Sequence, residues 1–187
     1  TPDKTALVWC DDTEEHDKIF TFSDISKLSN KAANFFKAQG VKKGDPVMLI
    51  LKRNYQFWYI MPALHKIGAI AIPATYLLTK KDIVYRDNAA SVKAIVATND
   101  ENVLAHVEAS VEDSPTLEKL VITNGQREGW ISFDEEIEKY PDVFERPVGE
   151  EATSNDDIML MYFTSGTTGN PKMAAHCFTY PLGHIIT

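Results

Sequence analysis

The sequence predicts an α/β fold with a mostly parallel sheet and helices on both of its faces. Short continuous apolar runs alternate along the chain with longer amphipathic segments that begin at capping residues. That alternation is typical of strands joined by right-handed helical crossovers. A hydrophobic fraction of 44% and a charged fraction of 25% over 187 residues agree with a globular domain.

The first segment reads as a strand at Lys4–Cys10, followed by an acidic turn and a returning segment at Ile19–Phe22. Thr21 and Asp24 have the spacing of a helix capping box, and Gly40 stands where a helix commonly ends. The apolar residues between them recur at helical spacing: Ile25, Leu28, Ala32, Phe35 and Phe36. We therefore predict a long helix after the returning segment.

Four short apolar runs predict the strands of the parallel sheet. The runs are short and lie between capped helices, and the first of them is continuously apolar, as in a strand that is buried on both faces. The four predicted strands are Val47–Leu51, Ala69–Ile72, Val92–Ala97 and Leu120–Ile122.

The helices between these strands are predicted from their first residues. Asn54 is a candidate cap for a second helix that ends at Gly68, with Pro62 expected to kink or divide it. Thr79, with Asp82 three residues later, predicts a third helix, and Asp100 predicts a fourth.

A short acidic helix is predicted after Ser132, with Glu135 three residues on. The polar connection Glu150–Asp157 then leads into a last buried strand, Ile158–Thr164. This strand runs directly into the string YFTSGTTGNPK, from Tyr162 to Lys172. Open parallel sheets bind ligands beyond the carboxyl ends of their strands, and the loop lies at such an end.

The composition of this loop suits a phosphate chain. Gly166 and Gly169 permit backbone turns in which several N–H groups point into one concavity. Lys172 adds a positive charge. The hydroxyl groups that can donate to phosphate or bind Mg²⁺ belong to Thr164, Ser165, Thr167 and Thr168.

The loop is neither a Walker A loop nor a nucleophile elbow. The two glycines are too close together for a Walker A loop, and Asn170-Pro171 precede the lysine, so the chain stays extended instead of entering a helix. Ser165 lacks the G-x-S-x-G frame of a nucleophile elbow. The alternative interpretation is a polar surface loop that binds no ligand.

The string from Phe163 to Lys172 resembles the signature loop of the adenylate-forming superfamily, which comprises acyl-CoA synthetases, luciferases and peptide-synthetase adenylation domains. The flanking segments are similar to that family over nearly the whole chain. Met173 after the lysine, in PKMAAH, resembles the medium-chain acyl-CoA synthetase branch and its acetyl-CoA-synthetase-like relatives.

The resemblance implies an acid–thiol ligase that uses ATP, Mg²⁺ and coenzyme A with a small-molecule carboxylic acid. A carboxylate attacks the α-phosphorus of ATP, and the thiol of coenzyme A then displaces AMP from the acyl-adenylate. The residues implied to contact the nucleotide phosphates are Thr164, Ser165, Gly166, Thr167, Thr168, Gly169, Asn170, Pro171 and Lys172. Among them, Thr167 and Thr168 are the expected Mg²⁺ ligands and Lys172 is the expected catalytic residue.

The rest of the family's catalytic site is expected beyond residue 187. This includes the adenine-binding stretch, the Mg²⁺-ligating glutamate, the acyl pocket and the small C-terminal domain with its adenylation lysine. The chain opens on TPDKTALVW without a methionine and closes on YPLGHIIT. We therefore predict that residues 1–187 form an incomplete N-terminal, AMP-binding domain that is inactive alone.

Two other function classes stay open. One is a luciferase-like or peptide-synthetase adenylating enzyme, and the other is a nucleotide- or phosphate-binding module without catalysis. A net charge of −8 argues against a nucleic-acid-binding surface, and no apolar stretch is long enough for a membrane span.

The cysteines and histidines predict no further chemistry. Cys10 and Cys177 predict two thiols without a disulfide, which favours the cytoplasm, or an organellar matrix if a targeting segment was removed. The five histidines lack metal-ligand spacing. A dyad of His176 and Cys177 is disfavoured because neighbours in sequence point apart, and packing is the expected role of both. Trp9, Trp58 and Trp130 are expected to pack in the core or between helices and the sheet, and the acidic run Asp134–Glu138 is expected on a solvated helix face.

Overall fold

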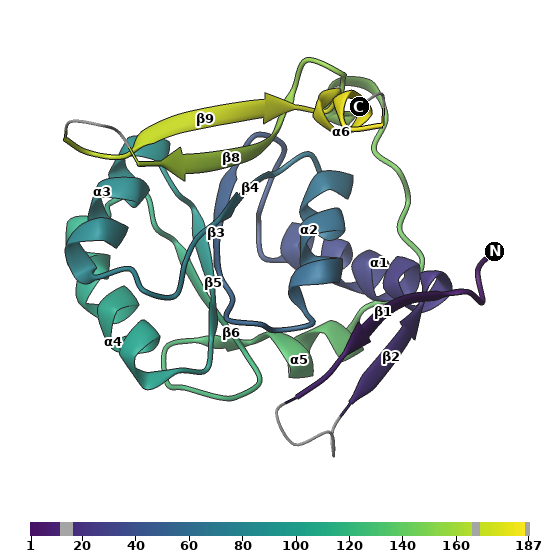
Figure 1. The fold of residues 1–187 in the computed structure, drawn as a ribbon, viewed down its shortest axis with the longest axis horizontal. Helices are drawn as coiled ribbons and strands as arrows, with labels where there is room; N and C mark the ends of the chain where they lie inside the picture. Colours follow the sequence, from purple (N-terminus) through teal and green to yellow (C-terminus); the bar gives the residue numbers. More distant parts are fainter. Residues whose placement is uncertain (12–16, 166–168, 186–187) are drawn as a thin grey trace.

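The computed structural model describes residues 1–11, 17–165 and 169–185. Its centre is a seven-stranded sheet in the order β7-β6-β5-β3-β4-β8-β9 (Figure 1). The strands of this sheet are β3 (Pro46–Ile50), β4 (Ile70–Pro73), β5 (Ala94–Thr98), β6 (Lys119–Thr123), β7 (Ile131–Ser132), β8 (Ile158–Thr164) and β9 (Lys172–Cys177). The helices are α1 (Phe22–Ala38), α2 (Phe57–Lys66), α3 (Lys80–Ala90), α4 (Glu101–Ser110), α5 (Phe133–Glu136) and α6 (Tyr180–Gly183).

The predicted parallel sheet is confirmed. The strands β3, β4, β5, β6, β7 and β8 pair in parallel with their neighbours, and β9 alone is antiparallel, to β8. The four predicted strands match β3, β4, β5 and β6 to within two residues at each end. The short strand β7 and the returning strand β9 were not predicted.

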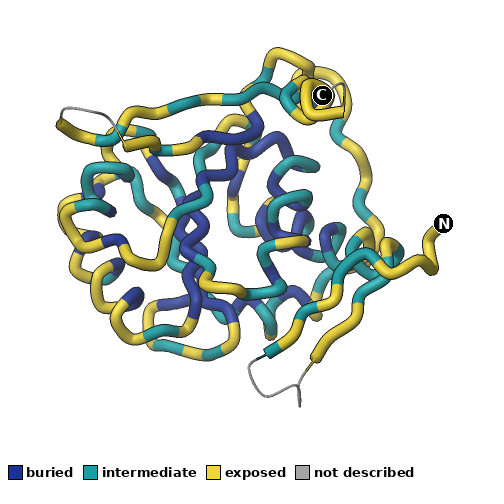
Figure 2. Tube along the Cα trace, viewed as in Figure 1, coloured by how far each residue is buried: buried dark blue, intermediate teal, exposed yellow. Residues whose placement is uncertain are grey.

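Both faces of the sheet are covered, which is why its central strands are continuously apolar. Along β3, Val47 and Leu49 belong to one buried cluster, whereas Met48 and Ile50 belong to another. The first cluster includes residues of α1, α2 and α5, and the second includes residues of α3 and α4. In Figure 2 the buried segments accordingly run through the middle of the sheet.

Three of the predicted helix starts are confirmed in atomic detail. Thr21 Oγ1 accepts a hydrogen bond from Asp24 N at 3.1 Å, and Asp24 Oδ2 accepts one from Thr21 N at 2.8 Å. Thr79 and Asp82 form the same capping box at the start of α3. Asp100 Oδ1 accepts from the backbone N–H groups of the first turn of α4. These bonds satisfy backbone donors that helix geometry leaves without partners.

The predicted start of the second helix was wrong. The N-cap position of α2 is Gln56, and no side chain caps it. The amide of Asn54 instead donates to Thr123 Oγ1 at 2.7 Å and to Thr98 Oγ1 at 3.2 Å. The helix also continues through Pro62 and is not divided there.

Two expectations about packing need correction. Trp58 is 55% exposed on α2 and does not belong to the core, whereas Trp130 is buried. Asp134 does not lie on a purely solvated helix face, because its carboxylate accepts hydrogen bonds from Asn124 N at 2.6 Å and from Gln56 Nε2 at 2.9 Å.

The N-terminal segment forms a small sheet of its own. The strands β1 (Thr5–Trp9) and β2 (Lys18–Thr21) pair in an antiparallel fashion. The ring of Trp9 lies edge-on to Tyr55 at 5.4 Å between centroids, and its indole N–H donates to the backbone oxygen of Arg53 at 2.6 Å. Trp9 thereby joins this hairpin to the segment that follows β3.

Candidate active site

The candidate site is the connection between β8 and β9. The middle of β8 is buried at Met159, Leu160 and Met161, and the strand becomes exposed at Thr164. Since β8 runs parallel to β4, Thr164 lies at the carboxyl edge of the sheet. The chain returns as β9 with Lys172 opposite Thr164. The predicted loop is therefore a hairpin connection at the edge where parallel sheets bind ligands.

Gly166, Thr167 and Thr168 lie outside the described residues, so their predicted phosphate and Mg²⁺ contacts stay predictions. Gly169, which is described, has a φ of +103°, and a Cβ placed there would meet no atom within 4 Å. The positive φ favours glycine at this position, whereas steric contact with neighbouring atoms does not require it.

Among the described residues, two side-chain hydrogen bonds add to the β8–β9 pairing at the base of the loop. Thr164 Oγ1 donates to the backbone oxygen of Lys172 at 3.3 Å. The hydroxyl group of Tyr85, on α3, donates to the backbone oxygen of Pro171 at 2.8 Å. In Figure 1, α3 lies next to the end of the β8–β9 hairpin at which the loop is drawn.

Lys172 supplies the positive charge of the site. Its side chain is exposed, and in the described part of the chain no carboxylate lies within ion-pair distance of it. The hydroxyl-bearing residues Thr164 and Ser165 are exposed on the other side of the loop. An exposed lysine paired across the hairpin with an exposed threonine, without an acidic partner among the described residues, fits an anionic ligand such as a phosphate chain.

Sequence reasoning missed a second polar cluster at the carboxyl edge. Asn54 follows β3, whereas Thr98 ends β5 and Thr123 ends β6, and the amide of Asn54 binds both hydroxyl groups. Beside them, Lys52 forms an ion pair with Asp100 at 3.3 Å. Part of the signal was present in the sequence, because Thr98 and Thr123 end two apolar runs and Asn54 lies four residues after a third, and the carboxyl ends of these runs meet at one edge.

His176 and Cys177 do not form a catalytic dyad. The ring of His176 packs on Tyr180 at 3.9 Å between centroids. The Sγ atom of Cys177 lies 2.9 Å from Thr179 Oγ1, and this hydrogen bond lowers the pKa of the thiol. The two side chains thus have separate partners, as expected of neighbours on a strand. No disulfide joins Cys10 and Cys177.

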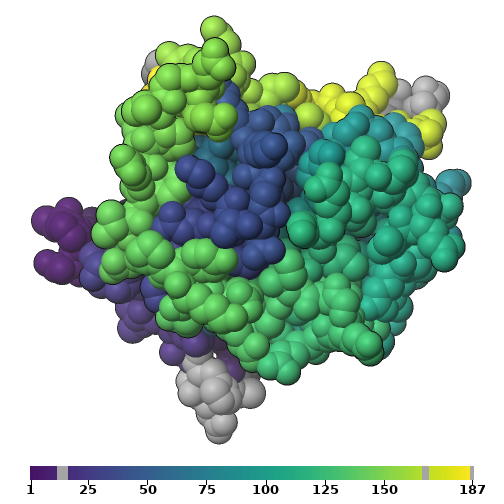
Figure 3. All heavy atoms as spheres, turned by 180° about the vertical axis from the view of Figure 1, so that it is seen from behind, coloured from purple at the N-terminus to yellow at the C-terminus, as the bar shows by residue number. Residues whose placement is uncertain are grey.

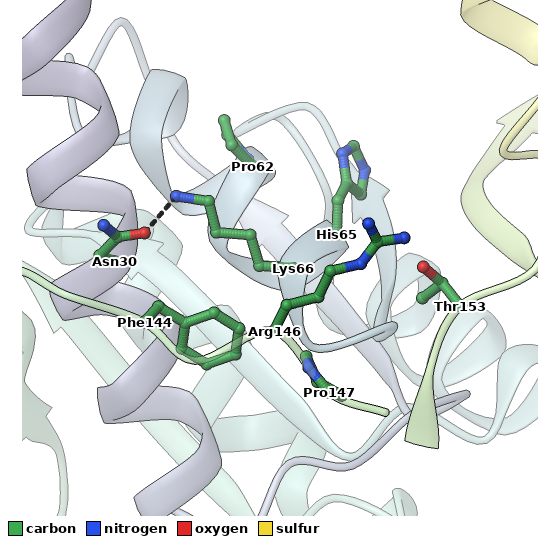
Figure 4. A pocket seen from close by; sticks show the side chains of 8 residues that line it. All are labelled: Asn30, Pro62, His65, Lys66, Phe144, Arg146, Pro147 and Thr153. Carbon is green, nitrogen blue, oxygen red and sulfur yellow. Dashed lines mark hydrogen bonds between the residues drawn. The ribbon is translucent and has the colours of Figure 1, made fainter. Parts of the chain in front are cut away.

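A cavity of about 490 Å³ lies away from the loop, between α1, α2 and the segment 144–153. Figure 3 shows this light-green segment beside the blue surface of the helices, and Figure 4 shows the lining side chains. The ammonium group of Lys66 lies in its wall and already donates to Ser29 Oγ and Asn30 Oδ1, each at 2.6 Å, and to the backbone oxygen of Ser26 at 3.3 Å. Because its three donors are used, Lys66 offers none to a ligand in this cavity.

The described residues contain no cluster of three or more His, Cys, Asp or Glu side chains that could hold a metal ion. No described helix is both long and apolar enough to cross a membrane.

Comparison with known proteins decides the family. The sequence profile described as "AMP-binding enzyme" matches residues 1–180, which is almost the whole chain. The chain belongs to the AMP-binding enzyme family. The family resemblance inferred from the loop is thereby confirmed.

The relatives of this AMP-binding chain include several named acyl-CoA synthetases. The mitochondrial acyl-coenzyme A synthetase ACSM5 of Rattus norvegicus is 37% identical over 191 aligned residues, which cover 98% of this chain and 31% of the relative. The 4-hydroxybutyrate–CoA ligase 1 of Metallosphaera sedula is 32% identical, with the same two coverages. The chain thus spans about a third of the length of these relatives.

Solved structures support the same fold. The anthranilate CoA ligase AuaEII, crystallised with anthranoyl-AMP, superposes with a TM-score of 0.81 at 28% identity, over 88% of this chain and 31% of that one. An acyl-CoA synthetase of Brucella canis has the same TM-score at 20% identity, over 98% of this chain and 32% of that one. The sheet and its covering helices are therefore those of the first part of an adenylate-forming enzyme.

Proposed function

We propose that this chain is the phosphate-binding part of an ATP-dependent carboxylate–CoA ligase. The observation that carries the proposal is the loop between β8 and β9, which places the exposed Lys172 beyond the carboxyl end of a buried parallel strand. The substrates proposed for the whole protein are ATP, a small carboxylic acid and coenzyme A, in line with the names of its relatives.

The proposed role of the loop is electrostatic. A carboxylate that approaches ATP is repelled by the phosphate chain, and negative charge grows on the pyrophosphate as it leaves. Lys172 and Ser165 would bind the β- and γ-phosphates and stabilise that charge in the transition state. Thr164 would join them once its hydroxyl group turns from the backbone oxygen of Lys172 to the phosphate. We assign the same phosphate contacts to Gly166, Thr167, Thr168, Gly169, Asn170 and Pro171.

A magnesium ion bound by Thr167 or Thr168 together with the phosphates would neutralise part of the same charge. The compartment proposed is a reducing one, either the cytoplasm or an organellar matrix. The second of these agrees with the word "mitochondrial" in the names of several relatives.

The test is the exchange of pyrophosphate into ATP by the full-length protein. Replacing Lys172 with alanine should slow carboxylate-dependent exchange by roughly 30- to 1000-fold, because a charge-assisted contact made in the transition state is lost. Transfer of a preformed acyl-adenylate to coenzyme A should change much less. Lys37→Ala, an exposed lysine on α1, is the matched control and should leave both rates unchanged.

The same assay separates the alternatives. Exchange without thioester formation would indicate a luciferase-like or peptide-synthetase enzyme. Nucleotide binding without exchange would indicate a non-catalytic module. Exchange at the wild-type rate in Lys172→Ala would remove this lysine from the mechanism.

A further inference from the structure

We propose that Tyr85 is a positioning residue that holds the end of the phosphate-binding loop against α3 and thereby places Lys172. The proposal rests on the proposed function of the loop. Tyr85 contacts the loop through its hydroxyl group, which donates to the backbone oxygen of Pro171 at 2.8 Å. Pro171 directly precedes Lys172, so the bond fixes the chain one residue before the ammonium-bearing side chain.

The chemistry of proline makes this contact important. Pro171 has no backbone N–H, so its carbonyl oxygen is the only backbone hydrogen-bonding group with which it can be held. Tyr85 uses that oxygen. The opposite strand contributes the longer bond of 3.3 Å from Thr164 Oγ1 to Lys172. The end of the loop also lies on β9, which has one neighbouring strand in the sheet.

The ring of Tyr85 is itself held by the strand that enters the loop. It packs edge-on against Phe163 of β8, with 6.2 Å between centroids and 72° between planes. The guanidinium group of Arg86 lies 5.2 Å from the centroid of the same Phe163 ring. The helix α3 therefore contacts both ends of the loop, through Phe163 before it and Pro171 after it.

The helix α3, which carries Tyr85 and Arg86, is stabilised at its first turn and by burial. Its first turn is closed by the capping box of Thr79 and Asp82, and Ile83 is buried beneath it. Arg86 Nη1 donates to the backbone oxygen of Asp82 at 2.9 Å, which orients the guanidinium group along the helix. A hydroxyl group presented by such a helix can restrict the loop more than a contact from another loop would.

The test compares half-reactions in the full-length protein. Tyr85→Phe keeps the ring against Phe163 and removes only the hydroxyl group. Carboxylate-dependent ATP–pyrophosphate exchange should fall by about 3- to 10-fold, the effect of losing one neutral hydrogen bond. The transfer of preformed acyl-adenylate to coenzyme A and the midpoint of thermal unfolding should stay at the wild-type values. Tyr140→Phe, which removes a hydroxyl group from a ring packed on Phe35, is the control and should change neither rate.

A double-mutant cycle asks whether Tyr85 acts through Lys172. If it does, Tyr85→Phe should reduce exchange by less than 2-fold when Lys172 is already alanine, because the positioned group is gone. A merely structural role would instead give the same loss in both backgrounds, together with a lower unfolding temperature.

The outcomes separate this inference from the proposed function. Full exchange in Tyr85→Phe, with an active wild-type protein, overturns the role of Tyr85 and leaves the proposed function standing. Equal losses in both half-reactions also overturn it. A wild-type protein that shows no exchange with any carboxylate tested overturns the proposed function, and the role of Tyr85 with it.

Discussion

Asp87 provides the sharpest test of the energetics of this fold. Its side chain is fully buried on α3, where Oδ2 accepts a hydrogen bond from Ser114 Oγ at 3.0 Å and Oδ1 has no partner among the described residues. Burial raises the pKa of this carboxyl group from 3.8 to about 6, although the bond from Ser114 opposes the shift. The perturbation is the isosteric change Asp87→Asn, which removes the titrating charge.

The sign follows from the raised pKa. The folded state binds the proton more tightly than the unfolded chain does, so Asp87 destabilises the fold at high pH, and stability increases as the pH falls through 6 towards 3.8. The shift of about 2 pKa units corresponds to a cost of about 3 kcal/mol at pH 8. At pH 5 the carboxyl group is mostly protonated in the folded state, and the cost drops to roughly half of that value.

Urea unfolding at pH 5 and at pH 8 measures this difference. The stability of Asp87→Asn relative to wild type should be more favourable at pH 8 than at pH 5, by on the order of 1 kcal/mol. Any constant cost of burying the amide cancels in that comparison, as do the other titrating groups. A relative stability that is the same at both pH values would refute the reasoning. Ser114→Ala, which removes the donor to the carboxylate, should be more destabilising at pH 8 than at pH 5.

Three further outcomes are expected. Gly68→Ala should lower stability by about 1–3 kcal/mol in urea unfolding, because φ is +74° and a Cβ would lie 2.9 Å from carbon atoms of both Lys43 and Thr153; an unchanged midpoint would contradict this. Ile95→Ala, in the central strand β5, should cost about 2–5 kcal/mol by the same measurement, and a cost below 1 kcal/mol would contradict the two-sided burial of the sheet. The isolated 187-residue chain should catalyse no ATP–pyrophosphate exchange, and measurable exchange would show that its site is complete.

The parallel sheet could be predicted because the local signals agree with one another. The run at β3 is apolar at every position, and the run at β5 is apolar at every position before Thr98. The capping boxes at Thr21 and Thr79 mark helix starts through bonds between residues three apart. The position of the loop at the carboxyl edge of the sheet could also be predicted, because the loop directly follows the apolar run that forms β8.

What could not be predicted depends on contacts between distant segments. Asn54 has the sequence context of a helix cap, but its side-chain amide instead forms hydrogen bonds with hydroxyl groups 44 and 69 residues away. The bond from Tyr85 to Pro171 joins residues that are 86 apart, and no periodicity in either segment signals it. The strand β9 also escaped prediction, because Lys172–Cys177 is only partly apolar and pairs at the edge of the sheet.

The polar cluster around Asn54 explains why the ligand site is expected at β8. Open α/β sheets bind ligands where the strand connections diverge, and here they diverge between β3 and β5, because α2 and α4 cover opposite faces. That position is filled by the chain's own Asn54, Thr98 and Thr123. The N-terminus of α2 is also closed, since Gln56 is fully buried and bonded to Asn124 and Asp134. With this helix end and this crevice occupied, we expect a phosphate chain at the carboxyl edge to be bound by the glycine- and hydroxyl-rich loop, and the Lys172 and Tyr85 variants test that arrangement.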